Sequence, residues 1–164
     1  MATPSSMLPL GTALPPVRLT NAVDGTEVDV GKLAAGARGV FVAFICNHCP
    51  YVVHLRKELV RVAHEALDRG IAVVAINSND PVTYPQDGPG PMGRLAKDEK
   101  WRFPFLFDAE GRLAYRGQFD DSRPSNGKPI TGSDLRAAIE AVVAGQKPSA
   151  NQKPSVGCNI KWRS

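Results

Sequence analysis

Two cysteines separated by two residues are the part of the sequence best suited to chemistry. Cys46 and Cys49 follow a short apolar run and lie just before an amphipathic stretch that begins at Pro50. A cysteine at the start of a helix is favoured as a thiolate, because the unpaired N–H groups there carry about half a positive charge. The thiolate is the nucleophile in disulfide exchange, and this spacing lets the second sulfur attack a mixed disulfide formed on the first. The pair is therefore predicted to cycle between a dithiol and a disulfide.

His48 lies between the two cysteines and, when protonated, adds positive charge that favours the thiolate. The same residues permit two other interpretations. Cysteine and histidine bind copper and zinc, but a structural zinc site takes four ligands, and the chain holds only Cys158 besides the pair. Two buried cysteines without chemistry are the other alternative, because free cysteine is common in protein cores. We favour thiol redox chemistry.

The elements that position the pair form a strand–helix–strand unit. The runs at 40–45 and 71–76 are short, continuously apolar and rich in β-branched residues, which is typical of buried strands in a parallel sheet. Between them, 50–69 has one apolar and one polar face and is followed by Gly70, which predicts a helix and its end. A right-handed crossover places the start of this helix at the carboxyl end of the first strand, where α/β folds hold their sites.

The remaining predicted elements lie in the second half of the chain. They are helices over 92–100 and 134–144, the latter with Ser133 as its N-cap, and a hairpin of strands 103–107 and 112–119. The segment 88–93 matches a dinucleotide-binding glycine pattern, but it does not follow a strand directly and has proline, which lacks an N–H, at two positions. We interpret 88–93 as a loop that borders the site.

The length and composition are those of one folded domain. With 164 residues, of which 43% are hydrophobic, the chain suits a single domain spanning 1–164. An extended lead-in is expected over about 1–16 and a polar, proline-containing tail over about 146–164.

Charge and hydropathy argue against several classes of partner. The net charge is +4, but the 20 Lys and Arg residues are spread along the chain and mixed with acidic residues, so no nucleic-acid-binding surface is predicted. The apolar runs are far shorter than the roughly 20 residues of a membrane span. The N-terminus lacks the pattern of a secretory signal, so we expect a cytoplasmic protein that binds no membrane. The sequence does not indicate the oligomeric state.

Several segments, taken together, resemble a known family. They are 44–51 around the cysteines, 75–80, 84–85, 115–124 and the tail 157–162. Over about 10–162 the chain resembles the redoxin branch of the thioredoxin-fold proteins, which includes the AhpC/TSA and peroxiredoxin-like thioredoxin proteins. The resemblance implies an α/β, thioredoxin-like fold with a central mixed β-sheet flanked by helices. It also implies that Cys46 is the attacking thiol, Cys49 the resolving thiol and no cofactor is needed, with a cis-proline facing the pair, for which Pro104 is the candidate.

The sequence departs from the pattern of its relatives in three ways. Thioredoxins have a buried Asp six residues before the first cysteine, and here that residue is Val40, so His48 becomes the nearest acid–base candidate. The peroxiredoxin pattern Pro-x-x-x-Thr-x-x-Cys fits neither Cys46 nor Cys49. Relatives also carry a helix and a strand after the Phe-Pro segment that this chain lacks. Disulfide exchange is therefore favoured over peroxide reduction.

Two further residues have open roles. Arg123 is either a positive group near the site or a surface arginine in a salt bridge. Cys158 is either a third thiol that exchanges with the pair when the tail folds back, or a packed thiol that anchors the tail. His54 and His64 fall on the polar face of the first helix and are predicted to be solvated.

The sequence thus predicts an enzyme, a thiol–disulfide oxidoreductase that acts on a protein or a low-molecular-weight thiol or disulfide and serves cell redox homeostasis. A thiol-dependent peroxidase with antioxidant activity is the first alternative. A copper- or zinc-binding thiol module is the second.

Overall fold

The computed structural model describes residues 2–101, 107–108 and 112–161, with only the backbone of 107–108. The strands are β1 (Ala2–Pro4), β2 (Arg18–Thr20), β3 (Glu27–Asp29), β4 (Gly39–Phe44), β5 (Ile71–Ile76), β6 (Phe107–Asp108) and β7 (Val156–Cys158). The α-helices are α1 (Pro50–Asp68), α2 (Pro89–Asp98) and α3 (Ser133–Val143), with short 3₁₀ turns η1 (Val30–Lys32) and η2 (Pro85–Asp87).

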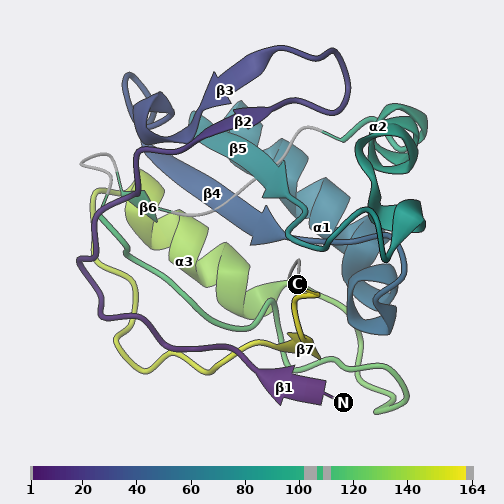
Figure 1. Ribbon diagram of the computed structural model, residues 1–164. Coiled ribbons are helices and arrows are strands. Elements are labelled where there is room, and N and C mark those ends of the chain that lie inside the picture. The colour runs from purple at the N-terminus through teal and green to yellow at the C-terminus, as the bar shows by residue number, and fades with distance from the viewer. Residues whose placement is uncertain (1, 102–106, 109–111, 162–164) are drawn as a thin grey trace.

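A mixed sheet of strand order β5-β4-β6 forms the centre of the described structure (Figure 1). β4 and β5 pair in parallel from Gly39 opposite Ile71 to Phe44 opposite Ile76. β6 pairs antiparallel with the start of β4. The two strands predicted around the first helix are confirmed, and β4 is buried over its first four residues, as expected for a strand covered on both faces.

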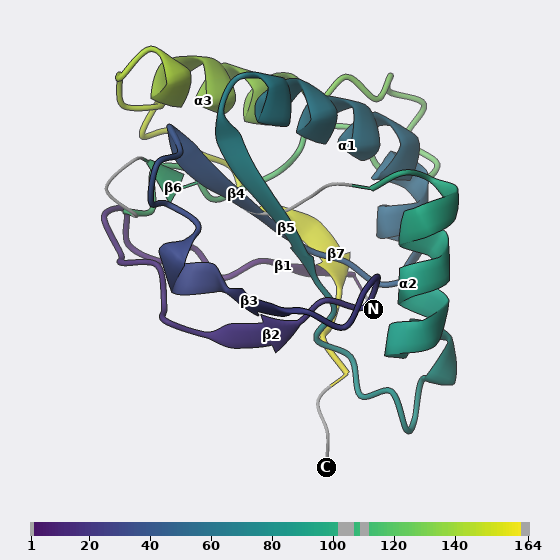
Figure 2. The same ribbon diagram turned by 90° about the horizontal axis from the view of Figure 1, so that it is seen from above.

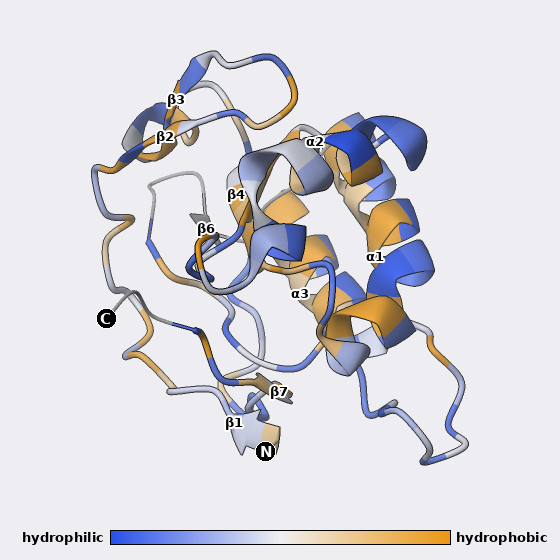
Figure 3. Ribbon diagram, turned by 45° about the vertical axis from the view of Figure 1, so that its right-hand side comes forward, coloured by the Kyte–Doolittle hydropathy of each residue, from blue (hydrophilic) through white to orange (hydrophobic). Residues whose placement is uncertain are grey.

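Helices α1 and α3 lie side by side on one face of this sheet (Figure 2). The apolar stripe of α1 contributes Leu59, Val62 and Ala66 to the core, which α3 completes with Leu135 and Ile139. In Figure 3 α1 turns its orange, apolar side inward and its blue, polar side outward. Burial of this stripe is what stabilises α1, because isolated helices gain little from propensity alone.

The β2–β3 hairpin lies on the other side of the sheet from α1 and α3 (Figure 2). The turn of this hairpin contacts α2 at a glycine. A Cβ atom added to Gly93 would lie 2.2 Å from the carbonyl oxygen of Ala22, so only glycine permits this approach.

The prediction of a loop over 88–93 is wrong, because α2 begins at Pro89. The two prolines, Pro89 and Pro91, fall in the first turn of the helix. N–H groups of a first turn have no partner within the helix, so proline costs little there.

Ser133 is the first residue of α3 and not its N-cap, which is Gly132. Gly132 has a left-handed backbone, with φ of 65°, and a Cβ there would lie 2.7 Å from the ring of Phe119. The buried carboxylate of Asp120 accepts hydrogen bonds from the backbone N–H groups of Gly132 and Thr131. Asp120 thus orders the turn that leads into α3, while the backbone N–H of Leu135 in the first turn of the helix donates to the carbonyl of Phe119.

The stretch 112–119 is not the regular strand that was predicted. Arg112 makes one isolated bridge with Ala13, and the backbone N–H of Gln118 donates to the carbonyl of Lys153. The polar groups of this stretch are thus satisfied by the lead-in and the tail.

The two ends of the described chain pair with each other. β1 runs antiparallel to β7, with Ala2 opposite Cys158 and Pro4 opposite Val156 (Figure 1). Among the described residues, no helix combines the length and the apolar character that a membrane span requires.

Candidate active site

The cysteine pair lies in the turn between the end of β4 and the start of α1, as predicted. The backbone N–H of Ile45 still donates to Ile76 of β5, and the chain then turns through Cys46 and Cys49 into the helix. Cys49 is the N-cap of α1, with extended backbone angles of −68° and 120°. Both cysteines are buried, with 8% and 3% of their surface exposed. This position beside the N-terminus of a 19-residue helix favours negative charge on sulfur.

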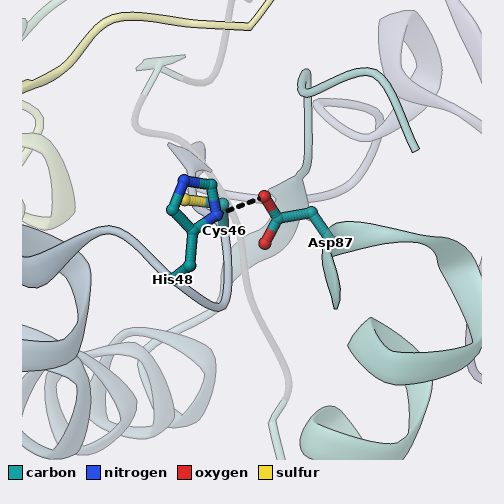
Figure 4. A group of neighbouring side chains, drawn as sticks. All are labelled: Cys46, His48 and Asp87. Atoms are coloured by element: carbon teal, nitrogen blue, oxygen red, sulfur yellow. Dashed lines mark ion pairs between the residues drawn. The ribbon is translucent and has the colours of Figure 1, made fainter. Parts of the chain in front are cut away.

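Cys46, His48 and Asp87 form one group of side chains at this turn (Figure 4). Their potential ligand atoms all lie within 4.8 Å of one another. The Nδ1 atom of His48 lies 2.6 Å from Oδ2 of Asp87, whose side chain is fully buried. The ring of His48 also stacks on that of Tyr84, with centroids 5.3 Å apart and planes inclined by 7°. The imidazole is therefore held in one orientation beside the Cys46 sulfur.

Asp87 is fixed from several directions. The backbone N–H of Asn47 donates to its Oδ1 at 2.8 Å, and the Asn79 side-chain amide donates to its Oδ2 at 2.9 Å. The Asn77 side-chain amide donates to its backbone carbonyl. Because these donors satisfy the buried carboxylate, the desolvation cost of an ionised Asp87 is offset.

Asp87 is the member of this group that the sequence did not predict. It ends η2, 40 positions after Asn47 in the chain, and no local pattern marks it. The segment 75–80, which is one of the segments that resemble the family, contains an indirect signal for Asp87. It carries Asn77 and Asn79, whose side chains donate to Asp87. A carboxylate thus lies near the cysteines even though Val40 replaces the Asp of thioredoxins.

The tail brings Cys158 to the pair. Its Sγ atom lies 2.9 Å from Sγ of Cys49, and all three cysteines are free thiols. Two roles were considered for Cys158, and the contact with Cys49 and the exposure of the residue favour the third thiol over the packed anchor.

The two thiols of the pair differ in pKa. The Cys46 thiol donates a hydrogen bond that lowers the pKa of Cys49 to about 4, against the opposing effect of burial and with a further contribution from Cys158. The same Cys46–Cys49 hydrogen bond, together with burial and the nearby charge of Asp87, raises the pKa of Cys46. We infer that the resting pair carries one negative charge, held mainly on Cys49.

The other predicted residues lie outside this group. Arg123 donates to the carbonyls of Asp120 and Ser122, so among the described residues it braces a loop. His54 contacts the Ser122 hydroxyl at 3.3 Å and is not simply solvated. Pro104, the candidate cis-proline, lies outside the described residues.

Comparison with known sequences identifies the family. Residues 9–129 match the redoxin family. The chain belongs to this family. Redoxins are generally thiol oxidoreductases or peroxidases, so the family supports a thiol-based redox function. No match was found among curated proteins.

Two solved structures resemble this redoxin over nearly its whole length. An uncharacterized conserved protein from Geobacillus kaustophilus is 41% identical, with a TM-score of 0.93, covering 99% of this chain and 97% of that one. A hypothetical protein from Sinorhizobium meliloti 1021 is 38% identical, with a TM-score of 0.92 and 99% of each chain covered. With the redoxin match and the mixed sheet flanked by helices, these likenesses confirm the predicted thioredoxin-like fold.

Proposed function

We propose that this redoxin is a thiol–disulfide oxidoreductase that uses Cys46 and Cys49 as its dithiol. The observation that carries the proposal is the buried Asp87 carboxylate 2.6 Å from His48, which is itself grouped with the Cys46 sulfur. Such an arrangement supplies an oriented base for a thiol whose own pKa is raised.

The proton transfer follows from the histidine geometry. Because Nδ1 of His48 lies 2.6 Å from Oδ2 of Asp87, the carboxylate favours the tautomer protonated at Nδ1, in which Nε2 is able to accept a proton. Asp87 acts as a positioning residue that stabilises the imidazolium formed when His48 takes the thiol proton of Cys46. The resulting Cys46 thiolate is the attacking nucleophile.

The exchange then proceeds in two steps. The Cys46 thiolate attacks one sulfur of a substrate disulfide; a mixed disulfide forms, and the first substrate thiolate leaves and takes the proton from His48. The Cys49 thiolate next attacks Sγ of Cys46, which forms the Cys46–Cys49 disulfide and expels the second substrate thiolate. The substrate gains two electrons and the pair loses two, and the reverse sequence oxidises a dithiol.

A protein disulfide is the substrate class that the surroundings favour. Phe44 and Val53 flank the pair in the sequence and expose 57% and 47% of their surface. Exposed apolar side chains beside a reactive group suit contact with a polypeptide. Low-molecular-weight disulfides remain substrates under the same chemistry.

The test is reduction of insulin disulfides with a chemical dithiol as the electron source. Cys46→Ser is expected to abolish turnover, and His48→Gln to reduce it by about 100-fold, the contribution of one general base. His64→Gln is the matched control, because His64 lies within α1, outside the cysteine turn, and contacts the carbonyl of Lys100. Turnover by Cys46→Ser at the wild-type rate would reject the proposal.

A metal site is the second candidate, because Cys46, His48 and Asp87 are grouped closely enough to hold an ion such as zinc. The hydrogen bonds to Asp87 argue against it, since both carboxylate oxygens already accept from N–H groups. One equivalent of copper or zinc retained through purification would support the metal site.

A peroxidase would instead form sulfenic acid at a cysteine rapidly, before any disulfide appears.

A further inference from the structure

Cys49 contacts the sulfurs of both other cysteines. The Cys46 thiol donates to it from one side, and the Cys158 sulfur lies 2.9 Å away. A sulfur with two thiol neighbours can form a disulfide with either. Cys49 is thus the pivot of a three-thiol chain in which Cys46 and Cys158 are the ends.

Hydrogen bonds on both sides hold Cys158 in place. Before it, β7 pairs with β1 over Val156–Cys158, and the backbone N–H of Ser5 donates to the carbonyl of Ser155. The tail is therefore fixed to the N-terminal segment directly at the cysteine.

After Cys158, the tail is attached to the loop that also holds Asp87. The backbone N–H of Lys161 donates to Oδ1 of Asn79 at 2.9 Å, and the backbone N–H of Asp80 donates to the carbonyl of Lys161 at 2.7 Å. Asn79 thus binds both the active-site carboxylate and the tail. Cys158 is preorganised against Cys49, which raises its effective concentration there far above that of a thiol in solution.

The three cysteines differ in exposure, and this difference gives disulfide exchange among them a direction. Cys46 and Cys49 are buried, whereas Cys158 is exposed. A disulfide between the first two sulfurs is therefore less exposed to an external reductant than one that includes Cys158.

We propose that Cys158 is a second resolving thiol, which moves the disulfide from Cys46–Cys49 to Cys49–Cys158 so that an external thiol reductant can attack it at the exposed tail. This proposal rests on the proposed function, because it requires the Cys46–Cys49 disulfide as its starting state.

The rearrangement is balanced within the chain. Cys158 loses its proton to solvent and attacks Sγ of Cys49; the S–S bond from Cys46 to Cys49 breaks, and that from Cys49 to Cys158 forms. Cys46 leaves as a thiolate and takes up one proton, so no net oxidation occurs. A dithiol reductant then attacks Sγ of Cys158, is oxidised to its disulfide and restores three free thiols.

The test is disulfide mapping of the full-length chain and three single variants. Each protein is reduced, oxidised in glutathione buffers, quenched with acid, alkylated and digested with trypsin. Cleavage after Arg38 and Arg56 leaves Cys46 and Cys49 on one peptide, so mass separates their internal disulfide from a cross-link to the Cys158 peptide. Circular dichroism of each variant confirms that it is folded.

The expected result is a cross-link of the Cys158 peptide in the wild type. Cys46→Ser should form at least tenfold more intramolecular cross-link than Cys49→Ser, because Cys158 contacts Cys49. Cys158→Ser should still form the Cys46–Cys49 disulfide.

The proposed movement of the disulfide to Cys158 is overturned if the Cys46→Ser variant keeps two free thiols, or forms only covalent dimers, in buffers that oxidise the Cys158→Ser variant. Failure of Cys158→Ser to form its disulfide would instead reject the proposed function. The two failures are therefore distinguishable.

Discussion

The charge of the dithiol is placed on one particular sulfur. Cys49 caps α1 and accepts a hydrogen bond from Cys46, whereas Cys46 lies beside the Asp87 carboxylate. Each of these features favours ionisation of Cys49 over Cys46. Cys49 is thus the thiolate that resolves, and Cys46 depends on His48 to become a nucleophile.

A pH titration of the thiolate absorbance tests this placement. Because the pKa of Cys49 is lowered to about 4, the thiolate is absent below that pH and present above it, including at neutral pH. Cys46→Ser should keep a low midpoint, since a serine hydroxyl still donates. Cys46→Ala should raise the midpoint, because the strongest stabilising hydrogen bond is gone. A low midpoint that survives in Cys49→Ser would place the thiolate elsewhere.

Asp87 is predicted to act through His48. Asp87→Asn removes the negative charge that stabilises the imidazolium but keeps an acceptor for the N–H of Asn47. We expect turnover to fall by about tenfold or more and the pH dependence of kcat/KM to change. A purely structural role would lower activity without altering the pH profile, and that outcome would contradict the assignment.

At the scale of elements, close packing of α2 against the β2–β3 turn depends on Gly93. Alanine would increase helix propensity by about 1 kcal/mol. Its Cβ, however, would lie 2.2 Å from the backbone oxygen of Ala22, which cannot rotate away.

We therefore expect Gly93→Ala to lower the free energy of unfolding by about 1–3 kcal/mol, the usual cost of overpacking. Chemical denaturation measures this directly. Equal or higher stability of the variant would show that α2 does not approach the turn this closely.

The elements that hold the cysteines were predictable, and several others were not. The strands β4 and β5 and helix α1 follow from hydrophobic periodicity, which depends only on local sequence. The cap at Gly132 depends on a tertiary partner, the Asp120 carboxylate, whereas prolines in the first turn are a local signal for the start of α2 that the prediction of a loop overlooked.

The same limit applies within the site. Cys46, His48 and Cys49 are neighbours in the chain, so their grouping was predictable. Asp87 and Cys158 join them through the loop after β5 and through the tail, and such distant contacts leave no periodic signal in a single sequence.

At the scale of the whole molecule, the first and last strands, β1 and β7, pair beside the site. β1 is exposed along its length, so it adds little to the core, yet it pairs with the strand that carries Cys158. The N-terminal segment therefore has a role in positioning a thiol that lies more than 150 positions away in the sequence.

Deletion of residues 2–5 tests this role. Without β1, the tail keeps its contact with Asn79 but loses the pairing of Val156–Cys158. We expect the Cys49–Cys158 cross-link to fall by about tenfold through the lower effective concentration. The Cys46–Cys49 disulfide should form as before. An unchanged amount of Cys49–Cys158 cross-link would show that β1 is dispensable for bringing Cys158 to Cys49.

The central claim is that Cys46 and Cys49 form a reversible redox pair. The most direct measurement is a titration of metal-free Cys158→Ser in glutathione buffers, with free thiols trapped by alkylation and counted by mass. We predict reversible loss of two thiols, with a midpoint between about −270 and −120 mV, the range of thioredoxin-fold oxidoreductases. Two thiols that stay free across this whole range would contradict the claim.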